Sequence, residues 1–325
     1  MLNRFAVSLA AVLLVAAAGV TTSATAQTWP SGTIKIVVPF AAGSTPDMVG
    51  RIIADSLSAK YAGTNFVVEN KPGASGNIGT DAVAKAVPDG SVIGISLGGP
   101  LAINTILFPQ LPYDPQKDIA PITLLTQLPS VLAVPTSLGV NSVAEFVARL
   151  KRDPGKINYG SIGVGSLSHL CMEAIGLKSG AKMVHVPYPG SPAAVTALIR
   201  GDVQAACLPA ISVTPQLGAG LKILAVSTPK RSAFLPDVPT LKESGIDVES
   251  DAWNGLIAPA GTPAPVITKI NADVREVLGK PEVVEKLKTQ LIAPYPSTPT
   301  EMRTKIDDEK KLWADVIKAA NIKIE

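Results

Sequence analysis

The chain has 325 residues, of which 46% are hydrophobic and 17% are charged. This length and composition predict one large domain or two domains with a sizeable core, and they exclude a disordered protein. The formal charge is only +3 and no basic run exceeds two residues, which argues against a nucleic-acid-binding surface. Two cysteines and two histidines are too few to organise the fold through a zinc cluster or a disulfide framework.

The first 26 residues have the pattern of a secretory signal peptide. Arg4 precedes an apolar run over residues 5–20, and small residues at 24–26 predict cleavage before Gln27. The apolar run is shorter than a bilayer span, which disfavours the alternative of a transmembrane anchor. No cysteine stands at the cleavage point, so a lipid anchor is not expected. We therefore expect a soluble, exported protein located in the periplasm.

Beyond residue 27, short apolar runs alternate with small-residue turns and amphipathic helices. The β-branched run 34–38 predicts a buried strand, the turn 39–47 follows it, and apolar residues at helical spacing predict a helix over 48–60. Thr45 suits the N-cap of this helix. The strands predicted in this first series are 34–38, 66–68, 92–97 and 122–125, and its helices are 48–60 and 78–87.

The same order of elements recurs in the second half of the chain. The strands predicted there are 156–159, 183–186, 203–208 and 221–226, and the helices are 167–177 and one that ends at Arg200. Two successive α/β units with the same order of strands predict two similar lobes rather than one long sheet.

Two apolar segments, 131–134 and 253–258, follow the fourth strand of each series and are expected to cross between the lobes. Three later helices have no strands left to pair with, so we expect them to pack on lobe one; they are 264–278, 281–290 and 299–320. The expected division is 27–127 with 252–325 for lobe one, and 128–251 for lobe two.

Ligands of open α/β sheets bind beyond the carboxyl ends of the strands. Two lobes that face each other across a double hinge bring two such edges together and form a cleft. The first strand of each series enters a turn rich in small residues that opens a helix, where unpaired N–H groups favour an anion. An exported, two-lobed protein with such a cleft is typical of solute-binding proteins.

Several motifs resemble the Bug family, the TctC-like receptors of tripartite tricarboxylate transporters. The resemblance covers essentially all of 28–325 with nearly constant spacing. The matching segments are Ile34–Asp47 with Arg51, Val68–Gly79, Pro88–Gly90, Asn158–Ser161 with Gly163, Gly165, Ser166, His169 and Leu170, Val186–Tyr188, Leu235–Thr240, Gly255–Leu256, Ala258–Pro263, and Trp313 with Ile317–Ala320.

The resemblance implies a type II periplasmic-binding-protein fold, in which two α/β lobes joined by a double hinge close on an organic acid. It also implies a monomeric receptor that delivers this acid to membrane transporter subunits, without catalysis, cofactor or metal. One ligand carboxylate would be held between the two helix-opening loops by main-chain amides, hydroxyls and water. Carried over by position, the binding residues are Phe40, Ala41, Ala42, Gly43, Ser44, Asp47, Asn77, Gly98, Ser161, Gly163, Gly165, Ser166, His169, Tyr188 and Leu208.

Some of these residues also have a structural interpretation. Asp47 is expected to stabilise the first turn of its helix, since a carboxylate would repel an acid. His169 is equally compatible with a capping contact and with the pocket wall. Ser161 and Ser166 are typical helix-capping residues whose hydroxyls can also reach a ligand.

Four further residues are expected to be structural. Cys171 falls on a predicted helix and Cys207 on a predicted strand of the same lobe, and we expect buried free thiols because a disulfide demands specific geometry. Trp253 and Trp313 are expected to anchor the packing rather than stack on a ligand.

The chain departs from the family pattern at positions that bear on the ligand. Ser44 replaces a second glycine and Pro46 stands where Ser or Thr is commoner, which stiffens the turn. Leu208 stands where relatives often carry an acid, including relatives that hold an α-ammonium. A buried ammonium needs a carboxylate or several acceptors, and Asp47 is the only acid in the expected cleft loops. We therefore expect a dicarboxylate, an aromatic carboxylate or a short oxo-acid to bind better than aspartate or glutamate.

The same loops contain no arginine or lysine. Carboxylate binding is therefore expected to rest on amides and helix N-termini. Replacement of Gly43 or Gly165 by a bulky residue should block it.

Two other classes of function are alternatives to a transport receptor. No Gly-x-Ser-x-Gly elbow is present, the glycine-rich run 160–165 lacks the third position of a dinucleotide fingerprint, and no paired carboxylates stand beside a base, so an exported enzyme is disfavoured. A receptor of the same fold that signals to a membrane kinase is not separable from a transport receptor by sequence.

Overall fold

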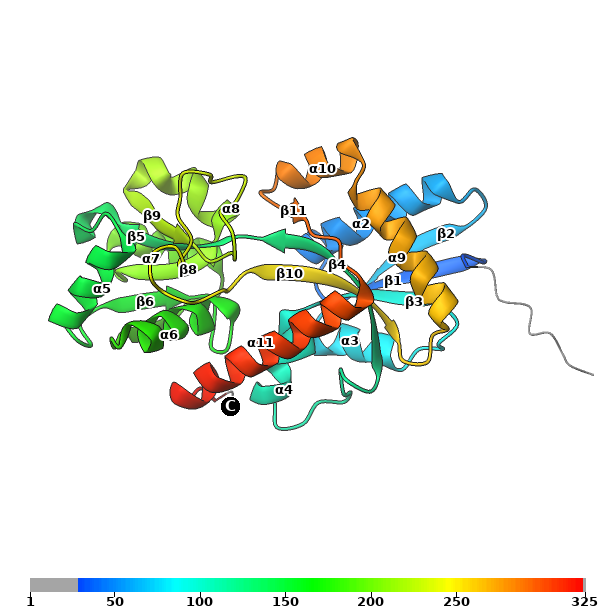
Figure 1. The fold of residues 1–325 in the computed structure, drawn as a ribbon, viewed down its shortest axis with the longest axis horizontal. Coiled ribbons are helices and arrows are strands. Elements are labelled where there is room, and N and C mark those ends of the chain that lie inside the picture. The colour runs from blue at the N-terminus through cyan, green and yellow to red at the C-terminus, as the bar shows by residue number, and fades with distance from the viewer. Residues whose placement is uncertain (1–28, 324–325) are drawn as a thin grey trace, which may run out of the picture.

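The computed structural model describes residues 29–323, so the predicted signal peptide and its cleavage site lie outside the described residues. The chain forms two α/β lobes, each built on its own sheet, which are connected by long extended strands (Figure 1). Within the described residues, no helix is both long and apolar enough to cross a membrane.

Lobe one contains a six-stranded sheet of order β11-β4-β10-β3-β1-β2. Its first three strands, β1 to β3, pair in parallel, as the buried β-branched run of β1 predicts, whereas β10 runs antiparallel to both β3 and β4. The strands are β1 (Thr33–Val38), β2 (Asn65–Asn70), β3 (Val92–Leu97), β4 (Ile119–Leu128), β10 (Ala252–Pro259) and β11 (Ala293–Pro294).

Lobe two contains a five-stranded sheet of order β7-β6-β8-β5-β9. Here β6 pairs in parallel with β7 and β8, and β5 runs antiparallel to β8 and β9. The strands are β5 (Ser130–Pro135), β6 (Asn158–Ser161), β7 (Val184–Pro187), β8 (Ala205–Pro209) and β9 (Leu221–Val226).

Helices cover both faces of each sheet and give four buried apolar clusters. The longer helices of lobe one are α2 (Thr45–Lys60), α3 (Asn77–Ala84), α9 (Ala264–Leu278), α10 (Pro281–Lys288) and α11 (Pro299–Ala319), and those of lobe two are α5 (Val143–Arg152), α6 (Leu167–Ser179) and α7 (Ser191–Arg200). Shorter turns are η1 (Ala74–Gly76), η2 (Gly99–Ile103), α4 (Asn104–Leu107), η3 (Thr136–Leu138), α8 (Ala210–Val213) and η4 (Thr214–Ala219).

The two segments predicted as crossovers are themselves strands. Residues 131–134 lie in β5, which pairs with β8 and β9, and residues 253–258 lie in β10, between β3 and β4. Every residue of β5 is buried, which explains the unbroken apolar run at 131–134. The connections between the lobes are therefore Pro129, between β4 and β5, and the segment that enters β10.

Helix α11 contacts both lobes, whereas the sequence predicted that all three C-terminal helices pack on lobe one. Its first half packs on β4 and η2 of lobe one, and its second half packs on α6 of lobe two (Figure 1). Trp313, Val316 and Ile317 join an apolar cluster that includes residues of α5 and α6. Trp313 is thus a packing anchor, as predicted, and it ties the C-terminus to the second lobe.

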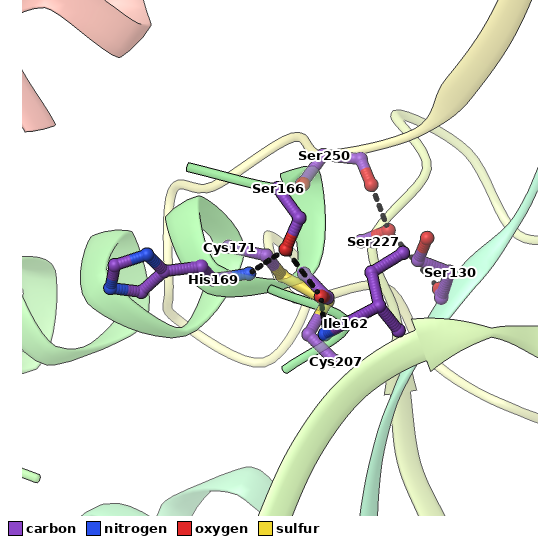
Figure 2. The surroundings of a disulfide bond; sticks show 9 residues. Ser130, Ile162, Ser166, His169, Cys171, Cys207, Ser227 and Ser250 are labelled. Carbon is purple, nitrogen blue, oxygen red and sulfur yellow. Dashed lines mark hydrogen bonds between the residues drawn. A yellow bond between two sulfur atoms is a disulfide. The ribbon is translucent and has the colours of Figure 1, made fainter. Parts of the chain in front are cut away.

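Cys171 of α6 and Cys207 of β8 form a disulfide bond, so the prediction of free thiols is wrong (Figure 2). Helix α6 packs on β8 and brings the two Cα atoms to 6.2 Å, within the range that a disulfide requires. Linear sequence does not reveal this proximity, because it depends on how the helix packs on the sheet. The bond closes a loop that begins at the first turns of α6.

Candidate functional site

A cavity of about 420 Å³ lies between the two lobes. It is lined by residues from the strand ends of lobe one, the loop that opens α6 in lobe two, the start of β10 and one side chain of α11. The lining residues are Phe40, Ser75, Leu97, Gly98, Gly99, Ile103, Asn104, Leu107, Ile162, Gly163, Val164, Gly165, Ser166, Leu167, Asp251, Ala252, Trp253 and Glu309. Two other surface hollows, one beside residues 228–234 and one between α2 and α10, lie away from the strand ends where ligands of α/β sheets bind.

The lobe-two wall of the cavity is the loop between β6 and α6. Ser166 is the N-cap of α6 and accepts a hydrogen bond from the His169 N–H. The Ser166 hydroxyl also donates to the Gly163 carbonyl, and the Ile162 N–H donates to Ser168. These contacts fold the loop tightly against the start of the helix.

Three N–H groups at this helix start receive no acceptor from the described residues; they belong to Val164, Leu167 and Ser168. Val164 and Leu167 line the cavity. The helix that follows is 13 residues long, so its positive end adds to the attraction for an anion. The described lining contains no arginine or lysine, which agrees with binding of a carboxylate by main-chain amides.

His169 acts as a capping partner of this loop rather than as part of the lining. Its Nδ1 accepts a hydrogen bond of 3.1 Å from the Gly165 N–H, so the ring carries its proton on Nε2. The ring stacks on His185 at 3.8 Å, and His185 Nε2 lies 2.6 Å from the Ser161 hydroxyl. Burial lowers the pKa of His169 to about 4, and the neighbouring His185 adds to this effect.

We expect the protein to lose stability as the pH falls from about 6.5 towards 4. The pKa of His169 in the folded state, about 4, lies below the ordinary value of 6.5, so the unfolded chain binds the proton more tightly. The stabilising effect of neutral His169 is complete above pH 6.5 and is lost as the pH falls through the folded-state pKa. Denaturant unfolding at pH 7.5, 5.5 and 4.5 measures it.

A His169→Gln variant is the matched control for this pH dependence. The glutamine amide oxygen can accept from the Gly165 N–H but does not titrate. The variant should show a smaller loss of stability between pH 6.5 and 4 than the wild type. An equal loss in both proteins would contradict the role of His169. His185 has a pKa lowered by burial and contributes in the same direction, so some pH dependence should remain.

The lobe-one wall is held by a strained turn and an amide network. Residues 73–76 all have positive φ values, of 131°, 47°, 56° and 90°, and Ala74 and Ser75 are not glycines. Such conformations cost energy and persist where the surroundings enforce them. Asn77 is buried and does not line the cavity. Its Oδ1 accepts from Asn104 Nδ2 at 2.7 Å and from the Tyr113 hydroxyl at 2.9 Å, so it positions Asn104, which does.

The turn that opens α2 stands apart from the cavity except for Phe40. Asp47 is buried and accepts hydrogen bonds from Arg51, from Asn70 and from the Gly43 N–H. Although burial raises the pKa of Asp47, these hydrogen bonds hold it below its ordinary value. Asp47 therefore fixes its own turn, in agreement with the structural interpretation, and the Gly43 amide is already occupied.

Of the residues carried over from the family, Phe40, Gly98, Gly163, Gly165 and Ser166 line the cavity. Three of the remainder have other clear environments: Ser161 lies buried behind the loop, Tyr188 packs under Gly160, and Leu208 is fully buried in the core of lobe two. Those that do not line the cavity in this structure are Ala41, Ala42, Gly43, Ser44, Asp47, Asn77, Ser161, His169, Tyr188 and Leu208.

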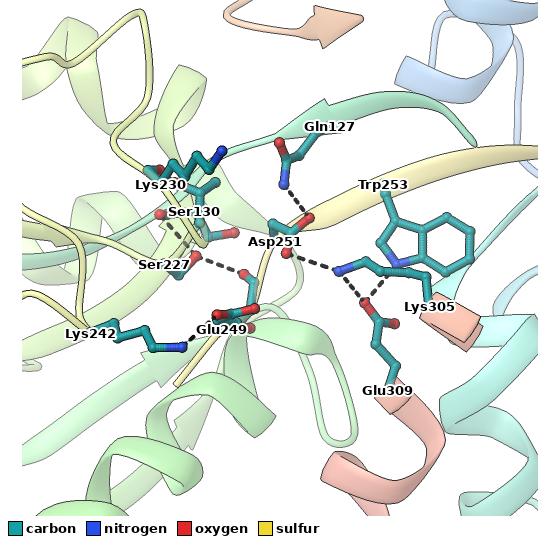
Figure 3. Close-up of polar contacts among 12 residues, drawn as sticks. Gln127, Ser130, Ser227, Lys230, Lys242, Glu249, Asp251, Trp253, Lys305 and Glu309 are labelled. Carbon is teal, nitrogen blue, oxygen red and sulfur yellow. Dashed lines mark hydrogen bonds and ion pairs between the residues drawn. The ribbon is translucent and has the colours of Figure 1, made fainter. Parts of the chain in front are cut away.

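The sequence prediction missed the polar wall of the cavity next to the hinge (Figure 3). Trp253 Nε1 donates to Glu309 Oε1 at 2.7 Å, and the Lys305 ammonium lies 3.2 Å from both Glu309 Oε1 and Asp251 Oδ1. Gln127 Nε2 donates to Asp251 Oδ2 at 2.8 Å. Trp253 is buried, as predicted, but its ring edge also lines the cavity. Asp47 is the only acid of the expected cleft loops, but the cavity lining also includes Asp251 and Glu309, which lie outside those loops.

The pKa values of Glu309 and Lys305 in this cluster are strongly shifted. Burial raises the pKa of Glu309 to about 7, against the opposing effect of the Lys305 ammonium. Although burial lowers the pKa of Lys305, its two carboxylate neighbours raise it above its ordinary value. A sequence signal for Glu309 did exist, because it interrupts the buried stripe of α11 that contains Met302, Ile306 and Trp313. An acid in such a stripe indicates a specific partner or a functional role.

The family model described as tripartite tricarboxylate transporter family receptor, TctC, matches residues 49–322. The chain belongs to this family. Protein BugT of Bordetella pertussis strain Tohama I is 33% identical over 316 residues, which cover 96% of this chain and 97% of that protein. The family resemblance predicted from the motifs is thus confirmed, and the protein is a periplasmic solute receptor of the Bug, or TctC, family.

Solved structures of similar proteins confirm the predicted fold class. The structure of R. palustris Rpa4515 with adipate is 34% identical, has a TM-score of 0.76 and covers 91% of this chain and 99% of that one. The structure of MatC (Rpa3494) from Rhodopseudomonas palustris with bound malate is 30% identical, has a TM-score of 0.71 and covers 89% of this chain and 100% of that one.

Proposed function

We propose that the protein binds a small organic acid, with a dicarboxylate of four to six carbons as the first candidate, in the cavity between its lobes. It then delivers this acid to the membrane subunits of a tripartite tricarboxylate transporter. The observation that carries the proposal is the start of α6, where Val164 and Leu167 line the cavity and their N–H groups have no acceptor among the described residues. A ligand carboxylate fits this position.

Two relatives support the class of ligand. The R. palustris structures contain adipate and malate, which are both dicarboxylates, and their folds match most of this chain. The apolar part of the lining, with Phe40, Leu97 and Ile103, suits the carbon chain of such an acid. We propose a binding role without catalysis, in a protein that acts as a monomer after removal of its signal peptide before Gln27.

The ligand is identified by a thermal-shift screen of organic acids, followed by calorimetry with the acids that raise the Tm. Mass spectrometry of the small molecules that co-purify provides an independent route. The proposal expects saturable binding of at least one dicarboxylate, such as succinate, malate or adipate. Absence of binding by every acid of the screen would contradict it.

Binding is further expected to bring the two lobes together. We propose that the moving units are 27–127 with 252–325, and 128–251, because the chain links between them are confined to Pro129 and the entry to β10. The contact between α11 and α6 must slide during this motion. Small-angle scattering should show a smaller radius of gyration at saturating ligand, and an unchanged profile would count against a hinged receptor.

A further inference from the structure

Glu309 belongs to the buried stripe of α11 and also lines the cavity; no other charged residue of this helix does both. The residue is only 8% exposed, and it projects from α11 towards the start of β10 (Figure 3). Its carboxylate packs closely on Gly98: a Cβ atom at that position would lie 2.6 Å from Glu309 Oε2. The carboxylate is therefore built into the wall, and Gly98 provides the space for it.

The two oxygens of this carboxylate have different surroundings. Oε1 accepts from Trp253 Nε1 at 2.7 Å and lies 3.2 Å from the Lys305 ammonium. No described residue donates a hydrogen bond to Oε2, the oxygen beside Gly98 (Figure 3). A proton bound by Glu309 would accordingly sit on Oε2, because Oε1 already accepts twice.

The charges around Glu309 leave little to neutralise a second anion. Lys305 is shared between Glu309 and Asp251, and Asp251 also accepts from Gln127. The charged groups that face this part of α11 from its own helix, from α6 and from the segment before β10 are Lys305, Asp308, Lys178, Asp247, Glu249 and Asp251. Lys242 adds a third ammonium group, which lies 3.6 Å from Asp247 Oδ1 and 3.4 Å from Glu249 Oε1, so these two carboxylates are already paired. The charged residues of the cavity lining itself are Asp251 and Glu309, without a lysine or arginine, so an added carboxylate meets a negative wall unless Glu309 is protonated.

We propose that Glu309 is a specificity-determining residue that receives the second carboxylate of a dicarboxylate ligand as a protonated acid, taking up one proton from solvent on binding. The inference rests on the proposed function, in which the first carboxylate lies at the start of α6. The proton on Oε2 is donated to a ligand carboxylate oxygen, giving a charge-assisted hydrogen bond. Burial raises the pKa of Glu309 to about 7, so protonation of this carboxylate costs little free energy at neutral pH.

The inference also distinguishes dicarboxylates from amino acids. An ammonium group would favour ionised Glu309 and would bind without proton uptake, whereas a carboxylate requires the protonated form. The preference for succinate over aspartate stays a prediction, and with Glu309 in the wall it is expected only where Glu309 is protonated, because an ionised Glu309 would attract the ammonium group of aspartate.

The test is isothermal titration calorimetry with succinate and adipate between pH 7 and 8.5, in two buffers of different ionisation enthalpy. Both ligand carboxyls are ionised throughout this range, and the two histidines are neutral because burial lowers their pKa values. The wild type should take up close to one proton per ligand at pH 8, and its affinity should fall on the order of tenfold as the pH rises from 7 to 8.5.

Glu309→Gln supplies a fixed donor and an acceptor at the same place. This variant should bind the dicarboxylate with no proton uptake and with an affinity that is nearly constant across the range. The matched control is Glu285→Gln, an exposed glutamate of α10, which should behave as the wild type does. Circular dichroism establishes that each variant is folded.

Three results would overturn the inference. Wild-type binding of a dicarboxylate without proton uptake would remove Glu309 as the acid and would leave the proposed function intact. Equal proton uptake by Glu309→Gln would assign the proton to another group. If neither dicarboxylate binds at any pH but aspartate does, the ligand class itself is wrong. If the variant does not fold, the wild-type measurement still tests the inference, because binding of a dicarboxylate without proton uptake would overturn it.

Discussion

Replacement of Gly165 by valine is expected to weaken ligand binding by about 100-fold or more, which corresponds to ~3 kcal/mol. Gly165 has a φ of 72°, a conformation that a β-branched residue adopts only at a cost, and it lines the cavity beside the start of α6. Its N–H is also the donor to His169 that shapes the loop. A side chain here both distorts the loop and fills the approach to the amides. Calorimetry with the identified ligand measures the effect.

The chain offers a matched control at the other end of the same helix. Gly180 is the C-cap of α6, has a φ of 65° and does not line the cavity. Gly180→Val should carry a similar backbone strain but should leave the affinity unchanged. Normal binding by Gly165→Val would show that the site is elsewhere. The sequence predicted the same loss for Gly43, but the structure makes its amide a partner of Asp47, so a smaller effect is expected there.

The second large effect is expected from loss of the disulfide. Cys171 and Cys207 are separated by 36 positions, and closing a loop of this length stabilises a protein by about 4 kcal/mol in the chain-entropy treatment. A Cys171→Ala and Cys207→Ala double variant should therefore unfold at a Tm lower by on the order of 10 °C. Differential scanning calorimetry without reductant provides the comparison.

Loss of packing by the sulfur atoms must be separated from loss of the cross-link. Both cysteines are buried, so a reductant reaches the bond only as the protein unfolds. Denaturant unfolding of the wild type with and without reductant isolates the contribution of the bond itself. Equal midpoints in the two conditions would show that the cross-link does not stabilise the protein.

The two-lobed fold was accessible from the sequence because its signals are local. Runs such as 34–38 and 221–226 are too apolar for exposed strands, and small-residue turns punctuate them at regular intervals. The all-apolar segment 131–134 of β5 predicts a buried crossover for the same reason that it forms a central strand: it has no polar face. Local pattern cannot distinguish a buried connection from a strand with neighbours on both sides.

The residues that distant segments contribute to the site are harder to predict from the sequence. The sequence predicts the loop that opens α6 because the residues of this loop are contiguous. The polar wall of the cavity next to the hinge instead combines Asp251 and Trp253 with side chains of α11. Glu309 is 58 positions from Asp251, and only the path of α11 across both lobes brings them together. The disulfide has the same origin, since its geometry depends on the packing of α6 against β8. An acid at a core position of an amphipathic helix was the only local sign.

The most direct test of the central claim is a crystal structure of the protein with a bound dicarboxylate, obtained with the acid that calorimetry ranks highest. We expect one ligand carboxylate within hydrogen-bond distance of the main-chain N–H groups at the start of α6, with the carbon chain against Phe40 and the second carboxylate directed towards Glu309 Oε2. A ligand bound outside the cavity between the lobes, or one whose carboxylates are held by lysine or arginine side chains instead of these amides, would contradict the account.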